Sequence, residues 1–283
     1  MKRFKEQAAR IAFALAACIS IIAVALICVF LFANGIPGML KIGVWDFLSG
    51  TTWKPGNNIY GILPMILGSV YVTAGALLVG VPAGLMTAIF LSRFASARAK
   101  RFMQPAVSLL AGIPSVVYGF FGLVVIVPMV RTFFGGTGSS LLSAVLLLGV
   151  MILPTIVTVS ESALNAVPQS YYEGALALGA THEHAVFKTV LPAAKSGVLA
   201  AVVLGVGRAI GEAMAVMMVA GNWAVMPKSL IKGVRTLTSN IVMEMGYAAD
   251  LHREALISTA VVLFVFVLII NLAFSAIKRK AKL

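Results

Sequence analysis

Six long apolar runs are the feature that most restricts what this chain can fold into. They span residues 11–33, 62–91, 105–130, 141–164, 198–221 and 256–277. A helix needs about 20 mostly apolar residues to cross a bilayer, and each run is at least that long. Charged residues are only 11% of the 283 residues, too few to cover the surface of a soluble protein. The sequence therefore predicts an all-α, polytopic membrane protein with six transmembrane helices.

The distribution of Lys and Arg predicts how these helices are oriented. If the N-terminus is cytoplasmic, the cytoplasmic segments carry fourteen Lys and Arg, and the longer external segments carry seven. Because positive residues concentrate on the cytoplasmic side, both termini are expected there. The chain has a basic start, and the apolar run after it is too long for a signal peptide, so we interpret it as an uncleaved first helix.

Three parts follow from this topology. Residues 1–60 hold the first transmembrane helix and the first external loop, 61–277 form a transmembrane domain of five helices, and 278–283 form a basic cytoplasmic tail. The domain includes one long cytoplasmic connection, 165–197. We also expect a partial or re-entrant helix in the external segment 222–255, which mixes polar and apolar residues.

The long cytoplasmic connection contains residues that typically start and end the helices of a helical hairpin. Ser170 and Glu173 fit a capping box just after Pro168, so a helix is expected to start at Ser170. Gly179 can end that helix, and Thr181 can cap a second helix that runs to residues 191–192. We predict a helix, a glycine turn and a second helix at the membrane surface.

Glycine and proline are frequent inside the apolar runs. Gly80 with Gly84 and Gly207 with Gly211 are GxxxG pairs, which let helices approach closely, and ordinary packing accounts for such pairs. Prolines inside a membrane helix break its backbone hydrogen bonds and are tolerated where a neighbouring helix or a cavity satisfies the freed groups. Together these residues indicate a bundle that bends or moves.

Three charged residues lie within or at the edges of the apolar runs. Arg208 and Glu212 are four residues apart, so on one helix they share a face and can form an ion pair. A structural pair is one interpretation. The other is a guanidinium that faces a transport path and takes an oxyanion in a bidentate fork. Glu161 lies near the cytoplasmic end of its run, where snorkelling to the interface is the simplest explanation.

Several function classes are excluded or disfavoured. The net charge of +13 has no nucleic-acid-binding motif beside it, and its position fits membrane orientation instead. Residues 135–140 are glycine-rich but lack the lysine of a P-loop, and no HExxH or GxSxG occurs. Cys18 and Cys28 form no metal or disulfide pattern. The three histidines lie outside the apolar runs and are expected to be solvated. We predict no catalysis, no metal and no cofactor in this chain.

The cytoplasmic hairpin also carries a motif with fixed spacing. It consists of Glu173-Gly174-Ala175, then Gly179, then Leu191-Pro192. This pattern resembles the EAA loop of ABC-importer permeases, in which E-A-A is followed by a glycine six residues after the Glu and then by I-x-L-P. Gly174 and Thr189 depart from the Ala and Ile of that pattern, which are modest changes on a helical surface. The resemblance implies a type I ABC-importer permease (MetI-like) fold whose hairpin docks into a cytoplasmic ATPase.

Further motifs narrow the resemblance. They are Tyr60–Pro64, Leu110–Gly119, Met151–Thr155, Gly207–Val216, Arg235–Ile241, Glu244–Gly246 and Leu251–Arg253. They look like the permeases of the phosphate-specific (Pst) transporter, and the last three are similar to its C-type subunit. The resemblance covers nearly the whole chain from about residue 58 onward, while the first helix and the loop after it match less specifically.

This resemblance implies a transport subunit of the bacterial inner membrane. It would form a heterodimer with an A-type permease, receive phosphate from an external binding protein, and depend on two cytoplasmic ATPase subunits for ATP hydrolysis. Arg208, with Glu212 beside it, is the candidate contact for phosphate. Ser115 and Tyr118 can add hydroxyl donors next to Pro114, although packing is the alternative role for both.

The residues alone leave other functions open. A permease for sulfate or molybdate would keep the hairpin, because one Arg does not distinguish tetrahedral oxyanions. An ion-coupled secondary transporter would need no ATPase and no coupling hairpin, and usually shows internal repeats, which we do not find here. A membrane scaffold or signalling subunit would need neither Arg208 nor Glu212.

Overall fold

The computed structural model describes residues 2–280, with the side chains of 2–5, 8, 9 and 277–280 left out. The side chains of Lys2, Arg3 and Lys5 in the basic start, and those of the basic tail, therefore lie outside the described part. Five helical segments are long and apolar enough to cross a membrane: Arg10–Ile42, Leu63–Phe94, Ser115–Phe134, Leu141–Asn165 and Asp250–Ala276. A sixth crossing is added if the bent pair His182–Ala193 and Lys195–Gly211 counts as one span. The all-helical prediction is confirmed.

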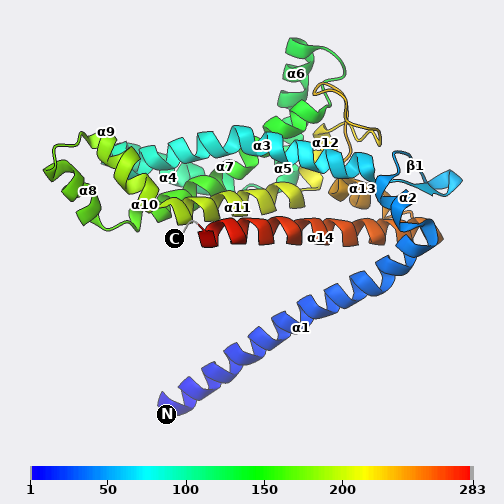
Figure 1. Ribbon diagram of the computed structural model, residues 1–283, viewed down its shortest axis with the longest axis horizontal. Coiled ribbons are helices and arrows are strands. Elements are labelled where there is room, and N and C mark those ends of the chain that lie inside the picture. The colour runs from blue at the N-terminus through cyan, green and yellow to red at the C-terminus, as the bar shows by residue number, and fades with distance from the viewer. Residues whose placement is uncertain (1, 281–283) are drawn as a thin grey trace.

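The first helix, α1 (Lys2–Ile42), diverges from the rest of the bundle (Figure 1). It touches α14 (Asp250–Lys280) near its C-terminal end, where the Ser258 hydroxyl donates to the Gly35 carbonyl at 2.7 Å. The external loop after α1 is folded: α2 (Val44–Ser49) leads to a short hairpin of β1 (Trp53–Lys54) and β2 (Ile59–Tyr60), joined by η1 (Pro55–Asn57). The two strands are antiparallel, with Trp53 opposite Tyr60.

The core of the bundle is the contact between α3 (Leu63–Ile89) and α7 (Leu141–Asn165), on which α11 (Lys195–Gly211) also packs. The π-helical turn η2 (Phe90–Phe94) extends α3. Gly80 lies against Ile152 and Gly84 against Ile156, so closely that a methyl group at either glycine would overlap the isoleucine. The first GxxxG pair is therefore a close-packing site, as predicted.

The third predicted span, 105–130, is wrong as a single helix. The structure has α4 (Ala97–Gly112) and then a break before α5 (Ser115–Phe121), η3 (Gly122–Ile126) and α6 (Val127–Phe134). Ile113 is extended, with φ −69° and ψ 127°, because the ring of Pro114 disfavours a helical residue before it. The span therefore begins at Ser115.

The fifth predicted span, 198–221, is also interrupted. α11 ends at Gly211, Glu212 is extended with φ −74° and ψ 123°, and α12 (Met214–Val219) follows. The external segment then returns along the outer end of the bundle and contains α13 (Leu237–Glu244). The helix expected in this segment is therefore present.

The cytoplasmic connection folds into the predicted hairpin. It contains α8 (Gln169–Ala177), α9 (His182–Ala185), η4 (Val186–Val190) and α10 (Leu191–Ala193). The capping box at Ser170 is wrong: α8 begins at Gln169, with Pro168 as its N-cap and no side-chain cap bond. Proline fixes its own φ and so sets the start of the helix without a hydroxyl. The hairpin and the C-terminus lie at the same end of the bundle (Figure 1).

Candidate functional site

Arg208 projects from the last turn of α11 and is half-buried. Its Nη1 donates a hydrogen bond to the Thr155 hydroxyl of α7 at 3.3 Å. The predicted ion pair with Glu212 is wrong: of the three ion pairs among the described residues, none includes either residue. The pairing required a continuous helix, and α11 ends one residue before Glu212.

Glu212 instead forms hydrogen bonds that stabilise the interruption between α11 and α12. Its Oε1 accepts a hydrogen bond from the Ala215 backbone N–H at 3.0 Å and so satisfies a free donor in the first turn of α12. Its backbone carbonyl accepts from the Thr238 hydroxyl of α13 at 3.0 Å. The external helix α13 is thereby tied directly to the interruption beside Arg208.

Thr155 and Thr238 are contacts that the sequence analysis did not identify. Thr155 ends one of the motifs that resemble Pst permeases, but the motif alone gave it no role. Nothing in the sequence joins Thr238 to Glu212, which is 26 residues away. Both are single neutral hydroxyls, so only the assembled bundle reveals them.

Ser115 and Tyr118 lie in the first two turns of α5, next to the Pro114 break. Tyr118 is buried, and its hydroxyl donates to the Leu110 carbonyl of α4 at 2.8 Å, which ties the two sides of the break together. Ser115 is half-buried at the first position of α5. The Tyr118 hydroxyl is thus occupied by a backbone acceptor.

Gly207 and Gly211 behave unlike the first GxxxG pair. Both are exposed, and a methyl group added at either would meet no described atom within 4 Å, apart from the adjoining backbone of its own helix. The helix face that carries these two glycines is therefore not covered by any helix among the described residues. Arg208 follows directly after Gly207, at the edge of this open face.

Glu161 does not snorkel, so that interpretation is wrong. It is only 9% exposed, and its Oε1 accepts a hydrogen bond from the Gln104 amide of α4 at 2.8 Å. The two side chains border a cavity of about 380 Å³ between α4 and α7, which also includes Ser108, Thr158 and Asn165. The cytoplasmic half of the bundle therefore contains a polar space with a buried carboxylate.

The hairpin turn follows a regular capping geometry. Gly179 has φ +87°, its N–H donates to the Leu176 carbonyl at 2.9 Å, and the Ala180 N–H donates to the Ala175 carbonyl at 3.1 Å. This is a Schellman motif, in which glycine takes the left-handed conformation at little cost. The Thr181 hydroxyl accepts from the His184 N–H, as predicted for the second cap.

The motif residues of the hairpin face outward or lie near the turn. Glu173, Gly174, Gly179 and Pro192 are exposed, while Ala175 and Leu191 are half-buried. Leu178, in the middle of the turn, is 92% exposed. Leu178 therefore presents an apolar side chain at the tip of the hairpin, beside the motif residue Gly179.

The inner side of the hairpin is fixed to the bundle. The Tyr172 hydroxyl and His182 Nδ1 share a hydrogen bond of 2.7 Å, and the His182 ring packs edge-on against Phe94 at 4.6 Å. The Arg93 guanidinium of η2 donates to the Gln169 side-chain oxygen of α8 at 3.3 Å. The expectation that His182 is solvated is therefore wrong. The His182 ring joins the hairpin to η2, the turn that extends α3.

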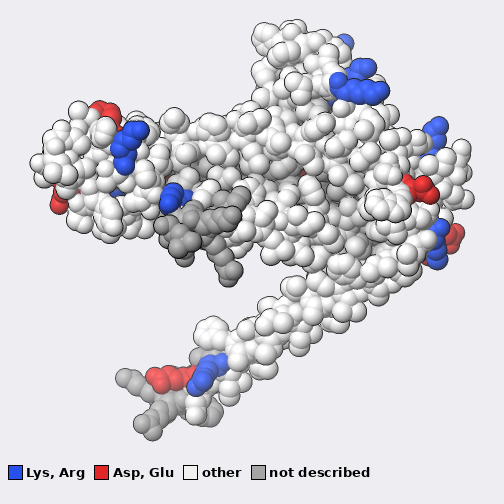
Figure 2. Space-filling model, in the orientation of Figure 1, with Lys and Arg blue, Asp and Glu red and all other residues white. Residues whose placement is uncertain are grey.

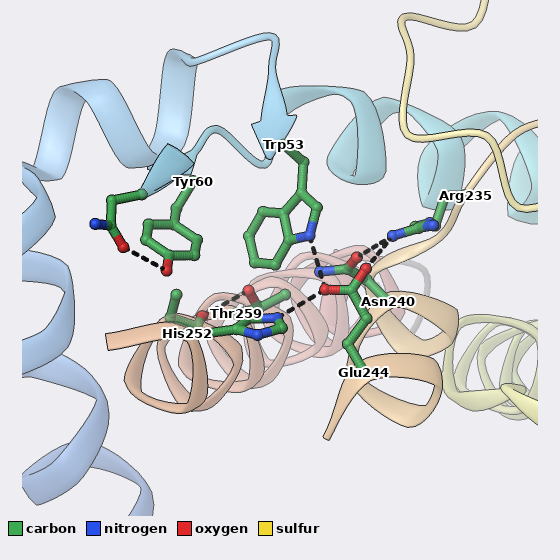
Figure 3. A network of polar contacts seen from close by, with 9 residues as sticks. Trp53, Tyr60, Arg235, Asn240, Glu244, His252 and Thr259 are labelled. Carbon is green, nitrogen blue, oxygen red and sulfur yellow. Dashed lines mark hydrogen bonds and ion pairs between the residues drawn. The ribbon is translucent and has the colours of Figure 1, made fainter. Parts of the chain in front are cut away.

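A buried cluster around Glu244 fastens the external end (Figure 3). Trp53 Nε1 and His252 Nε2 lie 2.9 and 2.8 Å from Glu244 Oε2, and Arg235 Nη1 lies 2.6 Å from Glu244 Oε1. The indole of the first external loop thus meets the segment around α13 on one carboxylate. His252 was also expected to be solvated, and this too is wrong. Burial raises the pKa of the neighbouring Tyr60 hydroxyl, and the negative charge of Glu244 raises it further.

The comparisons with known proteins agree with this architecture. The sequence pattern of a family described as "Binding-protein-dependent transport system inner membrane component" matches residues 80–283. The chain belongs to this family. It is therefore a multi-pass inner-membrane permease subunit of an ABC importer, a non-catalytic component that works with an ATPase and an external binding protein.

Two curated relatives of this permease are similar over most of their length. The probable ABC transporter permease protein YqgH of Bacillus subtilis is 42% identical over 273 residues, which cover 93% of this chain and 88% of the relative. The phosphate transport system permease protein PstC of Haemophilus influenzae is 34% identical over 265 residues, which cover 84% of each chain.

The fold of the permease also matches a solved structure. An inward-facing structure of the MetNI methionine ABC transporter aligns with a TM-score of 0.59 and 24% identity, over 78% of this chain and 94% of that chain. The predicted MetI-like fold is therefore confirmed.

Proposed function

We propose that this permease is the C-type subunit of a phosphate importer and forms part of the path that phosphate takes across the membrane. Support comes from the relatives named PstC, such as that of Pasteurella multocida at 33% identity over 86% of this chain, and from the motifs quoted above. YqgH, although 42% identical, has no substrate in its name. The substrate therefore has to be argued from the site.

One observation carries the proposal: Arg208 is a half-buried cation at the edge of an open glycine face. Its hydrogen bond within the described chain is to a neutral hydroxyl, Thr155, and no carboxylate is paired with it. The guanidinium charge is therefore available to an anion. A planar fork of N–H donors matches two oxygens of a phosphate, and the uncovered Gly207 and Gly211 leave room for the anion to approach.

A single guanidinium also suits a transport path better than it suits a tight binding site. Conduction requires a site that attracts its substrate and still lets it leave. Thr155 keeps the guanidinium oriented while no anion is present, and Glu212 is occupied at the first turn of α12, so it does not neutralise Arg208. We expect phosphate to replace the weak 3.3 Å contact to Thr155 rather than to break an ion pair.

The partners follow from the same proposal. An A-type permease would lie opposite the open face of α11, across the hydrated path. Two ATPase subunits would receive the hairpin motif, Glu173-Gly174-Ala175 with Gly179 and Leu191-Pro192. The exposed Leu178 would be buried in the ATPase groove. Because the hairpin contacts η2 through His182 and Phe94, its movement would pass to α3.

A transporter for another oxyanion is the second candidate, because Arg208 would take sulfate or molybdate by the same geometry. The test is uptake in cells that lack their own high-affinity phosphate system and receive the complete transporter with this chain. We expect ATP-dependent phosphate uptake that Arg208→Gln abolishes and that the exposed cytoplasmic Arg98→Gln leaves intact, with membrane levels equal by blot.

The outcomes separate the two candidates. Uptake of sulfate or molybdate in place of phosphate would overturn the substrate and keep the importer. Equal phosphate transport by the Arg208→Gln and Arg98→Gln variants would show that Arg208 does not contact the substrate.

A further inference from the structure

The buried carboxylate of Glu161 has only one of its two oxygens in use. Oε1 accepts the hydrogen bond from the Gln104 amide at 2.8 Å, whereas Oε2 has no hydrogen-bond partner among the described residues and is still open to the adjoining space. No ion pair formed by the described residues includes Glu161. A carboxylate that is only 9% exposed is costly to leave unpaired, so its free oxygen marks a place for a ligand.

Glu161 also lies apart from the charges on the molecular surface. On the face shown in Figure 2, Lys, Arg, Asp and Glu gather toward the ends of the molecule, and the long middle of the bundle is uncharged. Glu161 belongs to the last two turns of α7, a helix long and apolar enough to cross a membrane. A charged residue in such a helix faces the protein interior or a hydrated cavity, and it marks a functional site.

The cavity of about 380 Å³ that Glu161 borders, which we call the Glu161 cavity, also presents free hydrogen-bond donors. Thr158 is exposed, and its hydroxyl forms no hydrogen bond within the described part of the chain. Asn165 Oδ1 accepts from the Ser92 hydroxyl at 2.7 Å, and no described residue accepts from the Asn165 amide N–H groups. The groups left for a ligand are therefore one carboxylate oxygen that accepts, and a hydroxyl and an amide that donate.

This combination of groups selects among ligands. A metal cation would use oxygen acceptors only and would face the N–H groups of Asn165. Sulfate can only accept hydrogen bonds at neutral pH, so it would leave the Glu161 oxygen unpaired and repelled. An oxyanion that carries a proton, as phosphate does, can accept from Thr158 and Asn165 and donate its own O–H to Glu161. The proton stays on the oxyanion, and no bond other than a hydrogen bond forms.

The Glu161 cavity lies next to Arg208 on the cytoplasmic side. Thr155, which holds the Arg208 guanidinium, and Thr158, which borders the cavity, are three residues apart on α7. They therefore share a helix face and differ in height by about 4.5 Å. From Thr158, α7 continues toward the cytoplasmic hairpin. An anion that leaves Arg208 toward the cytoplasm would meet this cavity next.

Basic residues beside the cavity offset part of the charge of Glu161. Lys100 Nζ donates to the Ser92 carbonyl at 3.4 Å, and the Ser92 hydroxyl in turn contacts Asn165. The Arg93 guanidinium donates to the Leu164 carbonyl at 2.9 Å, one residue before Asn165. These cations attract an anion, whereas Glu161 repels it. The cavity should therefore hold its ligand loosely, as release into the cytoplasm requires.

We propose that the Glu161 cavity is a second oxyanion site on the cytoplasmic side of Arg208, and that Glu161 makes it selective for an oxyanion that carries a proton. The inference rests on the proposed phosphate path. It adds the selectivity that Arg208 cannot supply, because one guanidinium takes any tetrahedral oxyanion. A site built to pair with a substrate O–H rejects an analogue that lacks it, since the buried acceptor is then left unpaired.

The test measures binding of radiolabelled inorganic phosphate to the purified complete transporter, without nucleotide or binding protein. The transporter carries Arg208→Gln, which removes the first site, and the label is displaced by unlabelled phosphate, arsenate or sulfate. Arsenate, which also carries a proton, should compete as phosphate does, and sulfate should need a concentration about a hundredfold higher. Adding Glu161→Gln keeps an acceptor for Gln104 and turns an amide donor toward the cavity, so this ratio should fall at least about tenfold.

Two further variants serve as controls. Glu183→Gln removes an exposed cytoplasmic carboxylate of α9, outside the cavity, and should leave the ratio of sulfate to phosphate unchanged. Thr158→Val removes a donor that both oxyanions use, so it should weaken both and also leave the ratio unchanged. The partner permease is the same in every variant, so the differences report on this chain.

The outcomes keep this inference apart from the proposed function. No phosphate binding once Arg208 is replaced overturns the second site. An unchanged ratio after Glu161→Gln overturns its selectivity, and so does an equal loss of both oxyanions together with a lower melting temperature, which would make Glu161 structural. These results leave the phosphate path standing, because it is read from uptake with Arg208 intact. Uptake of sulfate or molybdate in place of phosphate would overturn both proposals.

Discussion

Two GxxxG pairs with the same spacing have opposite surroundings in this permease. Gly80 and Gly84 of α3 lie directly against Ile152 and Ile156 of α7, whereas no described residue outside their own helix packs against Gly207 and Gly211 of α11. The motif shows only that a helix face is smooth enough for close approach. The two glycines themselves do not determine what packs against that face. In α3 it is a helix of the same chain, and in α11 it is left for something outside the chain.

The residue next to each pair is consistent with this difference. Val81 follows Gly80, and Arg208 follows Gly207. An apolar neighbour suits a permanent contact within a bundle, while a charged neighbour on an open face suits a partner that is polar or that comes and goes. We therefore regard the first pair as part of folding and the second as part of transport.

The most direct test of this comparison is to substitute leucine for one glycine on each helix face. A Cβ at Gly80 would lie 2.6 Å from Ile152 side-chain atoms and 2.8 Å from the Gly149 carbonyl oxygen. Gly80→Leu should therefore destabilise the transporter by about 3 kcal/mol or prevent its assembly. Gly207→Leu should assemble with little change in stability and lose uptake. Thermal melting of the purified complex and uptake in cells measure the two effects. Equal destabilisation by both variants would contradict the comparison.

A smaller effect is expected where the open face ends. Glu212→Ala removes the acceptor of the Ala215 N–H and should cost about 1.5–3 kcal/mol, as for other hydrogen bonds to a charged group. Glu212→Gln keeps an oxygen in the same place and should retain most of the stability and uptake. If Glu212 were instead the ion-pair partner of Arg208, both variants would be equally harmful, and thermal melting of the pair decides between these accounts.

A third glycine, Gly179, is expected to matter through its backbone conformation and not through packing. Gly179 has open space around it, as Gly207 does, but its φ is +87°. Gly179→Ala should therefore cost about 1 kcal/mol through backbone strain and loosen the hairpin. We expect ATP hydrolysis to continue with less uptake per ATP. Uptake per ATP equal to that of Gly207→Ala would contradict the strained turn.

The smallest effect is expected from alanine at the open face. Because Gly207 is helical and exposed, Gly207→Ala should be neutral or stabilise α11 by up to about 1 kcal/mol. Gly80→Ala should destabilise, since even one methyl group overlaps Ile152. The difference in melting temperature between the two variants is the measurement. A positive shift for Gly80→Ala would show that α3 and α7 can separate at no cost.

The sequence predicts the fold class, the number of spans and the hairpin turn well, because these depend on local composition and on single residues such as Gly179 and Thr181. The interruptions of the spans are predicted less well. Pro114 marks one of them in the sequence, but apolar residues on both sides hide the break. At Glu212 no proline signals the end of α11, and only the contacts to α12 and α13 show why the helix stops there.

Polar partners are the hardest part to predict. Arg208 was identified correctly as a charge inside a span, but its partner was wrong, because helical spacing assumes a helix that the structure does not continue. His252 was expected to be solvated because it lies outside the apolar runs. Its actual neighbours, Trp53 and Glu244, come from the first external loop and from α13. Local sequence cannot supply the contact with Trp53, which lies in a distant part of the sequence.

The measurement that tests the central claim most directly is the reactivity of single cysteines on the two kinds of exposed helix surface. Cys18 and Cys28 are first replaced by serine. Gly207→Cys then places a thiol on the open face beside Arg208, and Leu78→Cys places one on α3, where the leucine is 77% exposed on an apolar surface. A charged, water-soluble thiol reagent is applied to the assembled transporter with and without phosphate-loaded binding protein and ATP.

The account predicts that the Gly207→Cys variant reacts much faster than the Leu78→Cys variant and that substrate slows this reaction, because the open face lines a hydrated path. Equally slow reaction of both variants, with no effect of substrate, would show that the face is covered by lipid or by another subunit, and would contradict the account.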